Sequence, residues 1–331
     1  HEKYLPLLAV LEWEKRICKD LDIKYATNIS GIHSQGVAAL KKYENIWEFN
    51  CLASSTYAVY AEYPFVRNKK ADNAYNKIIK NPLLSDEKNA LSFSAKIFYY
   101  NIFNLYYSAK GDKITQFRYA DQCLKLITSN HFYLKAHAYN HLIAVNNYID
   151  ALFSLQKYKI ALIEALNLRK TAIESSKNHT FFIMSFHWEL LILLRQGEFH
   201  KAAKRADAIA VILNTNQYDL FQRSISVLYF CIINAYFSNA ELKKTLHWSN
   251  KIVNECKEEW DLEVYCFSRI MQLIIYYELG NQDLLEYVVK STYRFLHKRN
   301  RLYKFETSVL NFIRKKIPRI FTDKERIEAF K

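Results

Sequence analysis

Glycine and proline are so scarce in this chain that long, closely packed helices are almost the only architecture open to it. The 331 residues include only five Gly and four Pro. Sheet-rich domains and dinucleotide-binding folds use glycine in their turns and phosphate loops. Half of the residues are hydrophobic and 15% are aromatic, which is enough to bury a core. The composition therefore predicts an all-α protein whose helices are joined by short connections.

A short pattern recurs along the chain at nearly constant intervals. It consists of Gly or a polar residue, then an aromatic residue or Leu, then a small residue three positions further on. The clearest copy contains Gly197, Phe199 and Ala202. Each copy ends one apolar-periodic run and begins another, so the pattern predicts the turn within a helix pair. The copies begin at 111, 156, 197, 240 and 280, separated by 45, 41, 43 and 40 residues, which predicts a period of about 42 residues.

The apolar runs divide the chain into one array of helix pairs, which we interpret as a single domain over 1–331. Three of the five glycines lie at the turns, where a left-handed backbone conformation is needed. An initial helix is expected at 2–24, before a loop at 28–31, and Ser85 or Asp86 is expected to begin a later helix. The expected pairs are 33–80, 86–128, 131–175, 179–214, 217–257 and 260–298, followed by a basic C-terminal cap at 302–331.

The spacing of the pairs and the start of each second helix resemble those of tetratricopeptide repeats. That family has Gly, then Tyr or Phe, then Ala just after the turn, as Gly197, Phe199 and Ala202 do here. The family's usual period of about 34 residues is shorter, and its Trp-x-x-Leu-Gly-x-x-Tyr signature is absent from this chain. The resemblance implies a tetratricopeptide-like α-solenoid, that is, a superhelix of antiparallel helix pairs.

A second resemblance rests on six short segments, namely 11–16, 81–84, 90–93, 276–281, 291–296 and 301–303. Together they resemble a family of uncharacterised helical-repeat proteins from the Bacteroidetes group of bacteria. The resemblance implies the same repeat architecture and no known activity. Members of that family typically carry a further helical segment upstream, and this chain begins at His1 rather than Met, so we expect an upstream segment to be missing.

Motifs of common enzymes and metal sites are incomplete in this sequence. The glycines of 31–36 have the spacing of a phosphate loop, but Val37 and Ala38 stand where Lys and Ser or Thr are required. His137 and His141 lie four residues apart, which could begin a zinc site, but no Cys, Asp or Glu nearby on the expected helix completes it. We therefore expect no catalytic activity, no metal and no cofactor.

The cysteines and the apolar runs give an expectation of the cellular compartment of the protein. None of the cysteines has metal-ligand spacing, and their apolar surroundings are typical of buried, reduced thiols. No run approaches the ~18 uncharged apolar residues of a membrane span, and no signal peptide is visible. We expect a cytoplasmic protein, with no indication of its oligomeric state. The cysteines are Cys18, Cys51, Cys123, Cys231, Cys256 and Cys266.

Polar side chains inside the expected first helices are the candidate peptide-binding residues. Asn is unfavourable within a helix because its amide competes for backbone hydrogen bonds. In stacked helix pairs, equivalent first-helix positions line the inner groove, where amides could bind the backbone of an extended peptide. The alternative is that these side chains satisfy contacts between helices or face water. The candidates are Asn101, Asn104, Asn140, Asn146, Asn147 and His187.

The net charge of +14 is concentrated at the C-terminal end. Residues 287–331 contain thirteen Lys or Arg and four acidic residues, which leaves a net charge of +9. A terminal helix pair needs a polar outer face, but not one of a single sign, so an acidic protein, a nucleic acid or an anionic surface could dock here. The candidate docking residues are Arg299, Arg301, Lys304, Arg314, Lys315, Lys316 and Arg319.

These features favour a non-catalytic scaffold that binds protein or peptide partners in a concave groove. Two alternatives remain open. One is a nucleic-acid-binding repeat protein that uses the basic C-terminal end. The other is a peptide-sensing regulator whose missing upstream part binds DNA.

Overall fold

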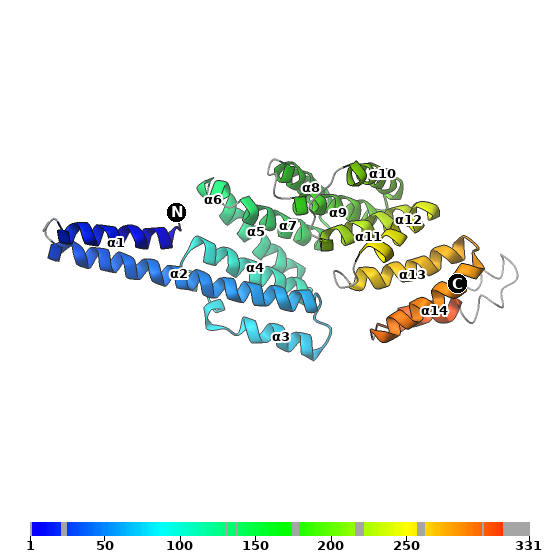
Figure 1. Cartoon of the computed structure of the whole chain (residues 1–331), viewed down its shortest axis with the longest axis horizontal. Coiled ribbons are helices and arrows are strands. Elements are labelled where there is room, and N and C mark those ends of the chain that lie inside the picture. The colour runs from blue at the N-terminus through cyan, green and yellow to red at the C-terminus, as the bar shows by residue number, and fades with distance from the viewer. Residues whose placement is uncertain are drawn as a thin grey trace. The chain divides into compact units, whose positions relative to one another are not determined.

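The computed structural model describes residues 2–20, 25–129, 131–136, 138–173, 179–215, 222–256, 262–299 and 301–313. Within these ranges the protein is all-α, with fifteen α-helices, two short 3-10 helices and no strand (Figure 1). The prediction of an all-α protein is therefore confirmed. The chain divides into two compact units, His1–Glu164 and Ala165–Lys331, which we call unit 1 and unit 2. Helix α8 (Tyr158–Ile173) spans the division.

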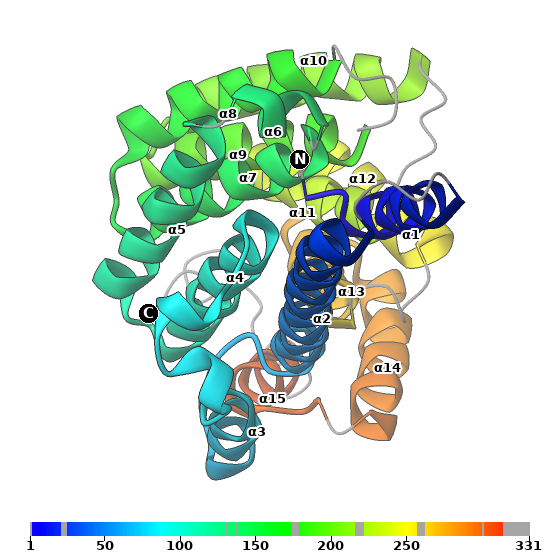
Figure 2. The same cartoon turned by 90° about the vertical axis from the view of Figure 1, so that its left-hand side faces the viewer.

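Unit 1 begins with a long helical hairpin. Its α-helices are α1 (Tyr4–Asp20), α2 (Tyr25–Glu62), α3 (Lys69–Ile79), α4 (Phe93–Lys110), α5 (Lys113–Thr128), α6 (His131–Ala136) and α7 (Ala138–Ser154), and its 3-10 helices are η1 (Pro82–Leu84) and η2 (Glu87–Asn89). Helix α1 packs along α2, as Figures 1 and 2 both show. The other end of α2 packs on α4, which also packs on α5. Helix α7 follows next, against α5.

The core of unit 1 is rich in tyrosine. The ring of Tyr119 stacks on that of Phe103 at a centroid distance of 4.9 Å and on that of Tyr107 at 5.6 Å. Tyr99 meets Phe103 edge-on at 4.8 Å. Offset and edge-to-face rings stabilise a core beyond the burial of their area, and the Tyr hydroxyl can still reach water or a polar partner. The high aromatic content of the sequence thus has a structural use between α4 and α5.

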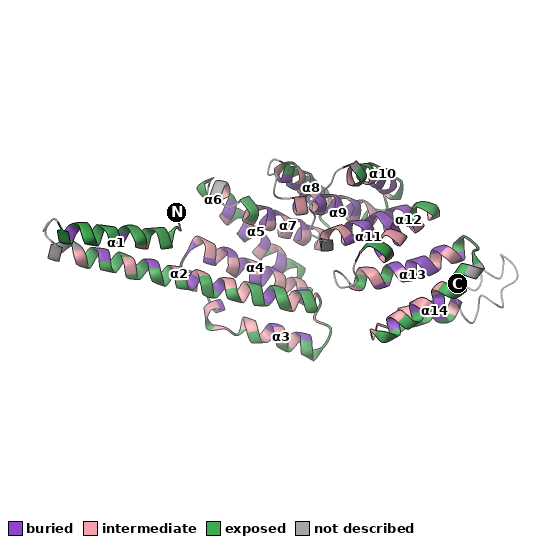
Figure 3. Ribbon diagram, viewed as in Figure 1, coloured by how far each residue is buried: buried purple, intermediate pink, exposed green. Residues whose placement is uncertain are grey.

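Unit 2 consists of three successive helix pairs and a short final helix. Its helices are α9 (His179–Arg195), α10 (Phe199–Thr215), α11 (Gln222–Ser238), α12 (Leu242–Glu255), α13 (Leu262–Glu278), α14 (Gln282–Lys298) and α15 (Lys304–Asn311). The first helix of each pair also packs on the first helix of the next, because α11 contacts both α9 and α13. Burial is concentrated on these first helices, whereas α1 of unit 1 is mostly exposed (Figure 3).

The five predicted turn positions share one backbone geometry. In each of them the chain leaves the first helix through a residue with positive φ, and two backbone N–H groups bond back to the last turn of that helix. At the clearest copy, the N–H of Gly197 donates to Leu194 and that of Glu198 to Leu193. This is the Schellman arrangement, which satisfies the last carbonyl groups of a helix. The residues with positive φ are Gly111 (75°), Gln156 (59°), Gly197 (75°), Ala240 (60°) and Gly280 (68°).

The fifth residue after each of these turn residues is buried. At this point the second helix lies against its neighbours, so a side chain there points into the core. Ala202 is fully buried, as the small residue of the sequence pattern predicts. The equivalent residues are Gln116, Ala161, Ala202, Thr245 and Leu285, none more than 5% exposed.

Two predicted helix boundaries are wrong. The loop expected at 28–31 is part of α2, which runs unbroken from Tyr25 to Glu62. Gly within a helix costs about 1 kcal/mol, but burial of Ile32 and Ala39 on this helix outweighs that cost. A side-chain carbon at Gly31 would meet nothing within 4 Å, so no close packing requires a glycine there.

The second wrong boundary is the start of α4. Asp86 accepts the N–H of Lys88 at 2.8 Å and caps η2 instead of a long helix, and Ser85 ends η1. The long helix begins at Phe93, where the hydroxyl of Ser92 accepts the N–H of Ala95 at 3.1 Å. Both residues are good N-caps, and the choice between them depends on how the segment packs. Helix α15 lies within the basic C-terminal cap expected at 302–331, and residues beyond 313 lie outside the described ranges.

Candidate functional site

Two of the candidate asparagines contact each other across neighbouring helices of unit 1. The Nδ2 of Asn147 on α7 donates to the Oδ1 of Asn101 on α4 at 3.1 Å. The thiol of Cys123 lies 3.8 Å from the same oxygen. Both asparagines are only partly buried. Within the described ranges, the Nδ2 of Asn101 and the Oδ1 of Asn147 have no hydrogen-bond partner, so this pair has one donor and one acceptor still available.

The other asparagines of unit 1 have different environments. Asn104 is 2% exposed, and its Oδ1 has no hydrogen-bond donor among the described residues. The Nδ2 of Asn140 donates to the hydroxyl of Tyr133 at 3.0 Å. Asn146 is partly buried and has a partner within the molecule. The surroundings of these three side chains differ from those of Asn101 and Asn147. The sequence pattern did not distinguish the two groups.

His187 belongs to unit 2, whereas the candidate asparagines belong to unit 1. Its imidazole lies 5.0 Å from the ring of Trp188, measured between centroids, on α9. Burial lowers the pKa of His187 to about 4, because the surroundings disfavour the charged ring. The side chain is therefore neutral at physiological pH.

The basic candidates within the described residues differ in the contacts that they make inside the protein. The guanidinium of Arg299 lies 3.8 Å from the ring centroid of Phe295. Arg301 donates to the hydroxyl of Tyr303 at 3.1 Å and lies 3.6 Å from a carboxylate oxygen of Glu263. Lys304 is exposed at the start of α15. The remaining candidates, Arg314, Lys315, Lys316 and Arg319, lie outside the described residues.

A polar contact between a second helix and the next first helix occurs in both units, and sequence reasoning missed it. In unit 1 the Nε2 of Gln116 on α5 donates to the Oδ2 of Asp150 on α7 at 2.7 Å. Burial raises the pKa of Asp150 to about 6, and the Gln116 hydrogen bond only partly opposes the rise. The carboxylate is thus held in the protein by one neutral donor.

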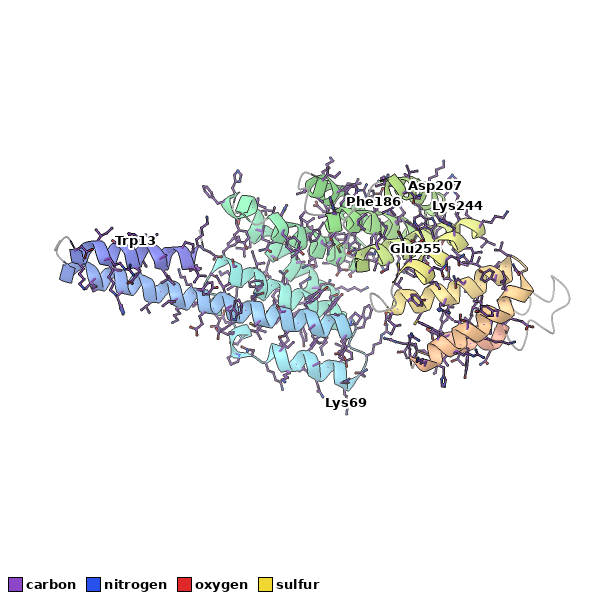
Figure 4. The ribbon with its side chains drawn as sticks, in the orientation of Figure 1. Trp13, Lys69, Phe186, Asp207, Lys244 and Glu255 are labelled. Carbon is purple, nitrogen blue, oxygen red and sulfur yellow. The ribbon has the colours of Figure 1, made fainter. Side chains whose placement is uncertain are left out.

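In unit 2 the corresponding contact is an ionic cluster around Glu189 of α9. A carboxylate oxygen of Glu189 lies 2.5 Å from Arg169 of α8 and 2.9 Å from Arg205 of α10. Both guanidinium groups lie over the ring of Phe186, at 3.9 and 5.3 Å from its centroid. Figure 4 labels Phe186. Arg169 also donates to the hydroxyl of Ser185 at 3.0 Å. One acid is therefore shared by two partly buried cations.

Two further contacts of this kind follow along unit 2. Asp207 of α10 accepts hydrogen bonds from the hydroxyl of Tyr236 at 2.9 Å and from the ammonium group of Lys244 at 2.8 Å. Figure 4 labels Asp207 and Lys244. Gln272 of α13 donates to Asn250 of α12 at 2.8 Å. The sequence separations of these pairs vary, so no fixed interval in the sequence would have revealed them.

The cysteine prediction needs a correction. Cys51 is exposed on α2 and Cys256 is only partly buried, whereas the other four are buried. The exposed face of the long α2 helix places Cys51 in solvent despite its apolar neighbours in the sequence. Burial raises the pKa of the thiols of Cys123 and Cys231 to about 12, so neither is reactive at neutral pH.

No cluster of three or more His, Cys, Asp or Glu residues in the described ranges could hold a metal ion. His137 lies outside those ranges, and His141 is partly buried, which lowers its pKa. None of the helices in the described part of the chain is long and apolar enough to cross a membrane.

Comparison with protein-family models, with curated proteins and with solved structures finds no match for this chain.

Proposed function

We propose that this chain is a non-catalytic, tetratricopeptide-like scaffold of the cytoplasm that binds polypeptide partners in a groove lined by its first helices. The proposal includes an α-solenoid with a period of about 42 residues, as the turn positions 111, 156, 197, 240 and 280 suggest. Five Schellman turns with equivalent hydrogen bonds support it, because repeated turns allow the pairs to stack in the same way. We also propose that the chain is a member of the Bacteroidetes helical-repeat family that its sequence resembles.

The main support for polypeptide binding is the Asn101–Asn147 pair. An extended peptide backbone offers one N–H donor and one C=O acceptor per residue. The pair has the complementary groups available, namely the Oδ1 of Asn147 and the Nδ2 of Asn101. The amide–amide bond at 3.1 Å fixes both side chains, so little conformational entropy would be lost when a backbone binds. Backbone recognition of this kind would accept many side chains.

The experiment is selection of peptides from a displayed random library on the full chain, followed by affinity measurements with purified variants. Asn101→Ala combined with Asn147→Ala should weaken the selected peptides about tenfold or more, since two charge-neutral hydrogen bonds contribute about 1 kcal/mol each. Asn140→Ala is the matched control, because Asn140 already donates to Tyr133 within the protein. Peptides that bind the double variant as well as the parent would contradict the groove, provided that its melting temperature is unchanged.

A further inference from the structure

Helix α14 has a cationic and aromatic outer face. Its inner face packs in the core of unit 2 through Leu285, Val289 and Leu296. The opposite face is exposed and contains Tyr287, Lys290, Arg294, His297 and Lys298. Lys290, Arg294 and Lys298 are spaced at i, i+4 and i+8, which places them in one row with a rise of about 6 Å between neighbours. We call this row, with Tyr287, the α14 outer face.

The cations of this face are less neutralised than Lys244 of the second helix α12. Lys244 of α12 contacts both Asp207 and Glu241, at 2.8 and 2.7 Å. On α14, by contrast, Lys290 has one distant acid, Glu286, at 3.8 Å.

Arg294 and Lys298 have no acidic partner within ion-pair distance among the described residues. The C-terminal part of α14 therefore presents uncompensated positive charge. A solvated capping face would not require such a bias, because polar side chains of either sign would keep it soluble.

An exposed tyrosine lies in the same row. Tyr287 is 72% exposed, so its ring is accessible from solvent. On the flank of the helix, Tyr293 stacks with His297 at a centroid distance of 5.8 Å and an interplanar angle of 24°. Cations that contact phosphates, together with accessible aromatic rings that stack on bases, are the combination by which proteins hold single-stranded nucleic acid.

We propose that the α14 outer face binds single-stranded nucleic acid, with Lys290, Arg294 and Lys298 on successive phosphates and Tyr287 against a base. The proposal does not rest on peptide binding by the first helices, since it uses a different helix and a different face. A membrane surface is a poorer fit, because the aliphatic face of α14 is already buried against α13 and is not available for insertion. An acidic polypeptide would use the cations but would leave Tyr287 without a role.

The test is fluorescence anisotropy of the full chain with labelled single-stranded RNA and DNA of roughly twenty nucleotides, longer than the site of a single binding module. The variant carries Lys290→Gln, Arg294→Gln and Lys298→Gln. The control carries Lys201→Gln, Lys204→Gln and Lys243→Gln, which removes the same charge from second helices α10 and α12. Affinity is measured between about 50 and 200 mM salt.

We expect the α14 variant to lose at least tenfold in affinity, and the slope of log K against log salt to fall by about 2, since each lost phosphate contact removes about 0.7. The control variant should retain most of the parent affinity and slope. Tyr287→Ala should weaken binding about fivefold or more without changing the slope, because stacking contributes roughly 1–3 kcal/mol per base.

Three results would overturn the proposal. Equal losses in the two triple variants would mean that net charge alone attracts the oligonucleotide. Binding of polyglutamate as tight as that of RNA, with no effect of Tyr287→Ala, would assign the face to acidic polypeptides. Absence of oligonucleotide binding by the parent chain at the lowest salt would remove the site altogether. None of these results bears on the peptide-binding groove, whose residues lie in other helices.

Discussion

The two units place different chemistry between a second helix and the first helix that follows it. In unit 1, Asp150 of α7 accepts a hydrogen bond from one neutral donor, Gln116 of the preceding second helix α5. In unit 2, Glu189 meets two guanidinium groups, those of Arg169 and Arg205. A buried carboxylate is costly unless it is paired and hydrogen-bonded. The comparison teaches that a carboxylate between neighbouring helices can be held by an ionic cluster or by one neutral donor. Removal of its negative charge should have opposite effects on stability in the two cases.

The largest effect is expected from Glu189→Gln. The substitution keeps the size of the side chain but leaves two partly buried cations without an acid, and the free energy of unfolding of unit 2 should fall by about 3 kcal/mol or more. Burial already lowers the pKa of Arg169, against the opposing effect of Glu189, so the guanidinium depends on that acid. Urea unfolding measures the change.

Glu198→Gln is the matched control for this prediction. Glu198 forms an exposed ion pair with Lys201 at 3.0 Å on the same unit, and exposed pairs contribute between zero and about 1 kcal/mol. If the two substitutions have equal effects, Glu189 is not the anchor of the cluster. Replacing Arg169, Glu189 and Arg205 together with apolar residues should cost much less than Glu189→Gln, because no uncompensated charge would remain.

The opposite response is expected at Asp150. Its pKa is raised from 3.8 to about 6 in the folded protein, so the folded state binds the proton more tightly than the unfolded state. The contribution of this group to stability is therefore present below pH 3.8 and is lost as the pH rises through 6. Asp150→Asn should raise the free energy of unfolding of unit 1 by about 2–3 kcal/mol at pH 7, since Asn can still accept the Gln116 hydrogen bond.

The measurement is urea unfolding of parent and variant from pH 4 to pH 8. The advantage of Asp150→Asn should grow between about pH 4 and 6 and then stay constant. Glu44→Gln, an exposed acid of α2 in the same unit, should show no such growth. A variant that is less stable than the parent at pH 7 would show that the charged form of Asp150 is needed and that burial does not dominate its energetics.

The turns of this fold could be read from the sequence, whereas the contacts between pairs could not. Gly111, Gly197 and Gly280 mark turns because only glycine adopts positive φ without strain. Each such signal lies within a few residues of the structure it specifies. The Gln116–Asp150 contact instead joins residues 34 apart, and its existence depends on how two helices are rotated against each other.

The same distinction applies to the candidate site. The unfavourable helix propensity of Asn drew attention to Asn101 and Asn147, which do contact each other, but it applied equally to Asn104, which is buried. Propensity is a local property and does not say which face of a helix is covered. The α14 outer face could have been found from the i, i+4, i+8 spacing of Lys290, Arg294 and Lys298. That Arg294 and Lys298 have no acidic partner among the described residues is visible only in the fold.

The smallest predicted effects test whether the five turns are equivalent in both units. Gln156 in unit 1 and Ala240 in unit 2 adopt positive φ at positions where the other turns have glycine. A left-handed conformation costs an L-residue about 1–2 kcal/mol, while glycine increases the conformational entropy of the unfolded chain by about 0.4–1 kcal/mol. The difference predicts that Ala240→Gly and Gln156→Gly each stabilise their unit by about 0.5–1 kcal/mol.

Two substitutions complete this test. Gly197→Ala should destabilise unit 2 by about 1 kcal/mol through strain alone, because a side-chain carbon there would meet nothing within 4 Å. Ala208→Gly makes the same chemical change as Ala240→Gly, but at an exposed position inside α10, where it should destabilise by about 1 kcal/mol. Opposite signs for Ala240→Gly and Ala208→Gly in urea unfolding would show that backbone conformation, and not loss of a methyl group, decides the effect. Destabilisation by Ala240→Gly would mean that its turn differs from that of Gly197, and the case for equivalent repeats in unit 2 would fail at that pair.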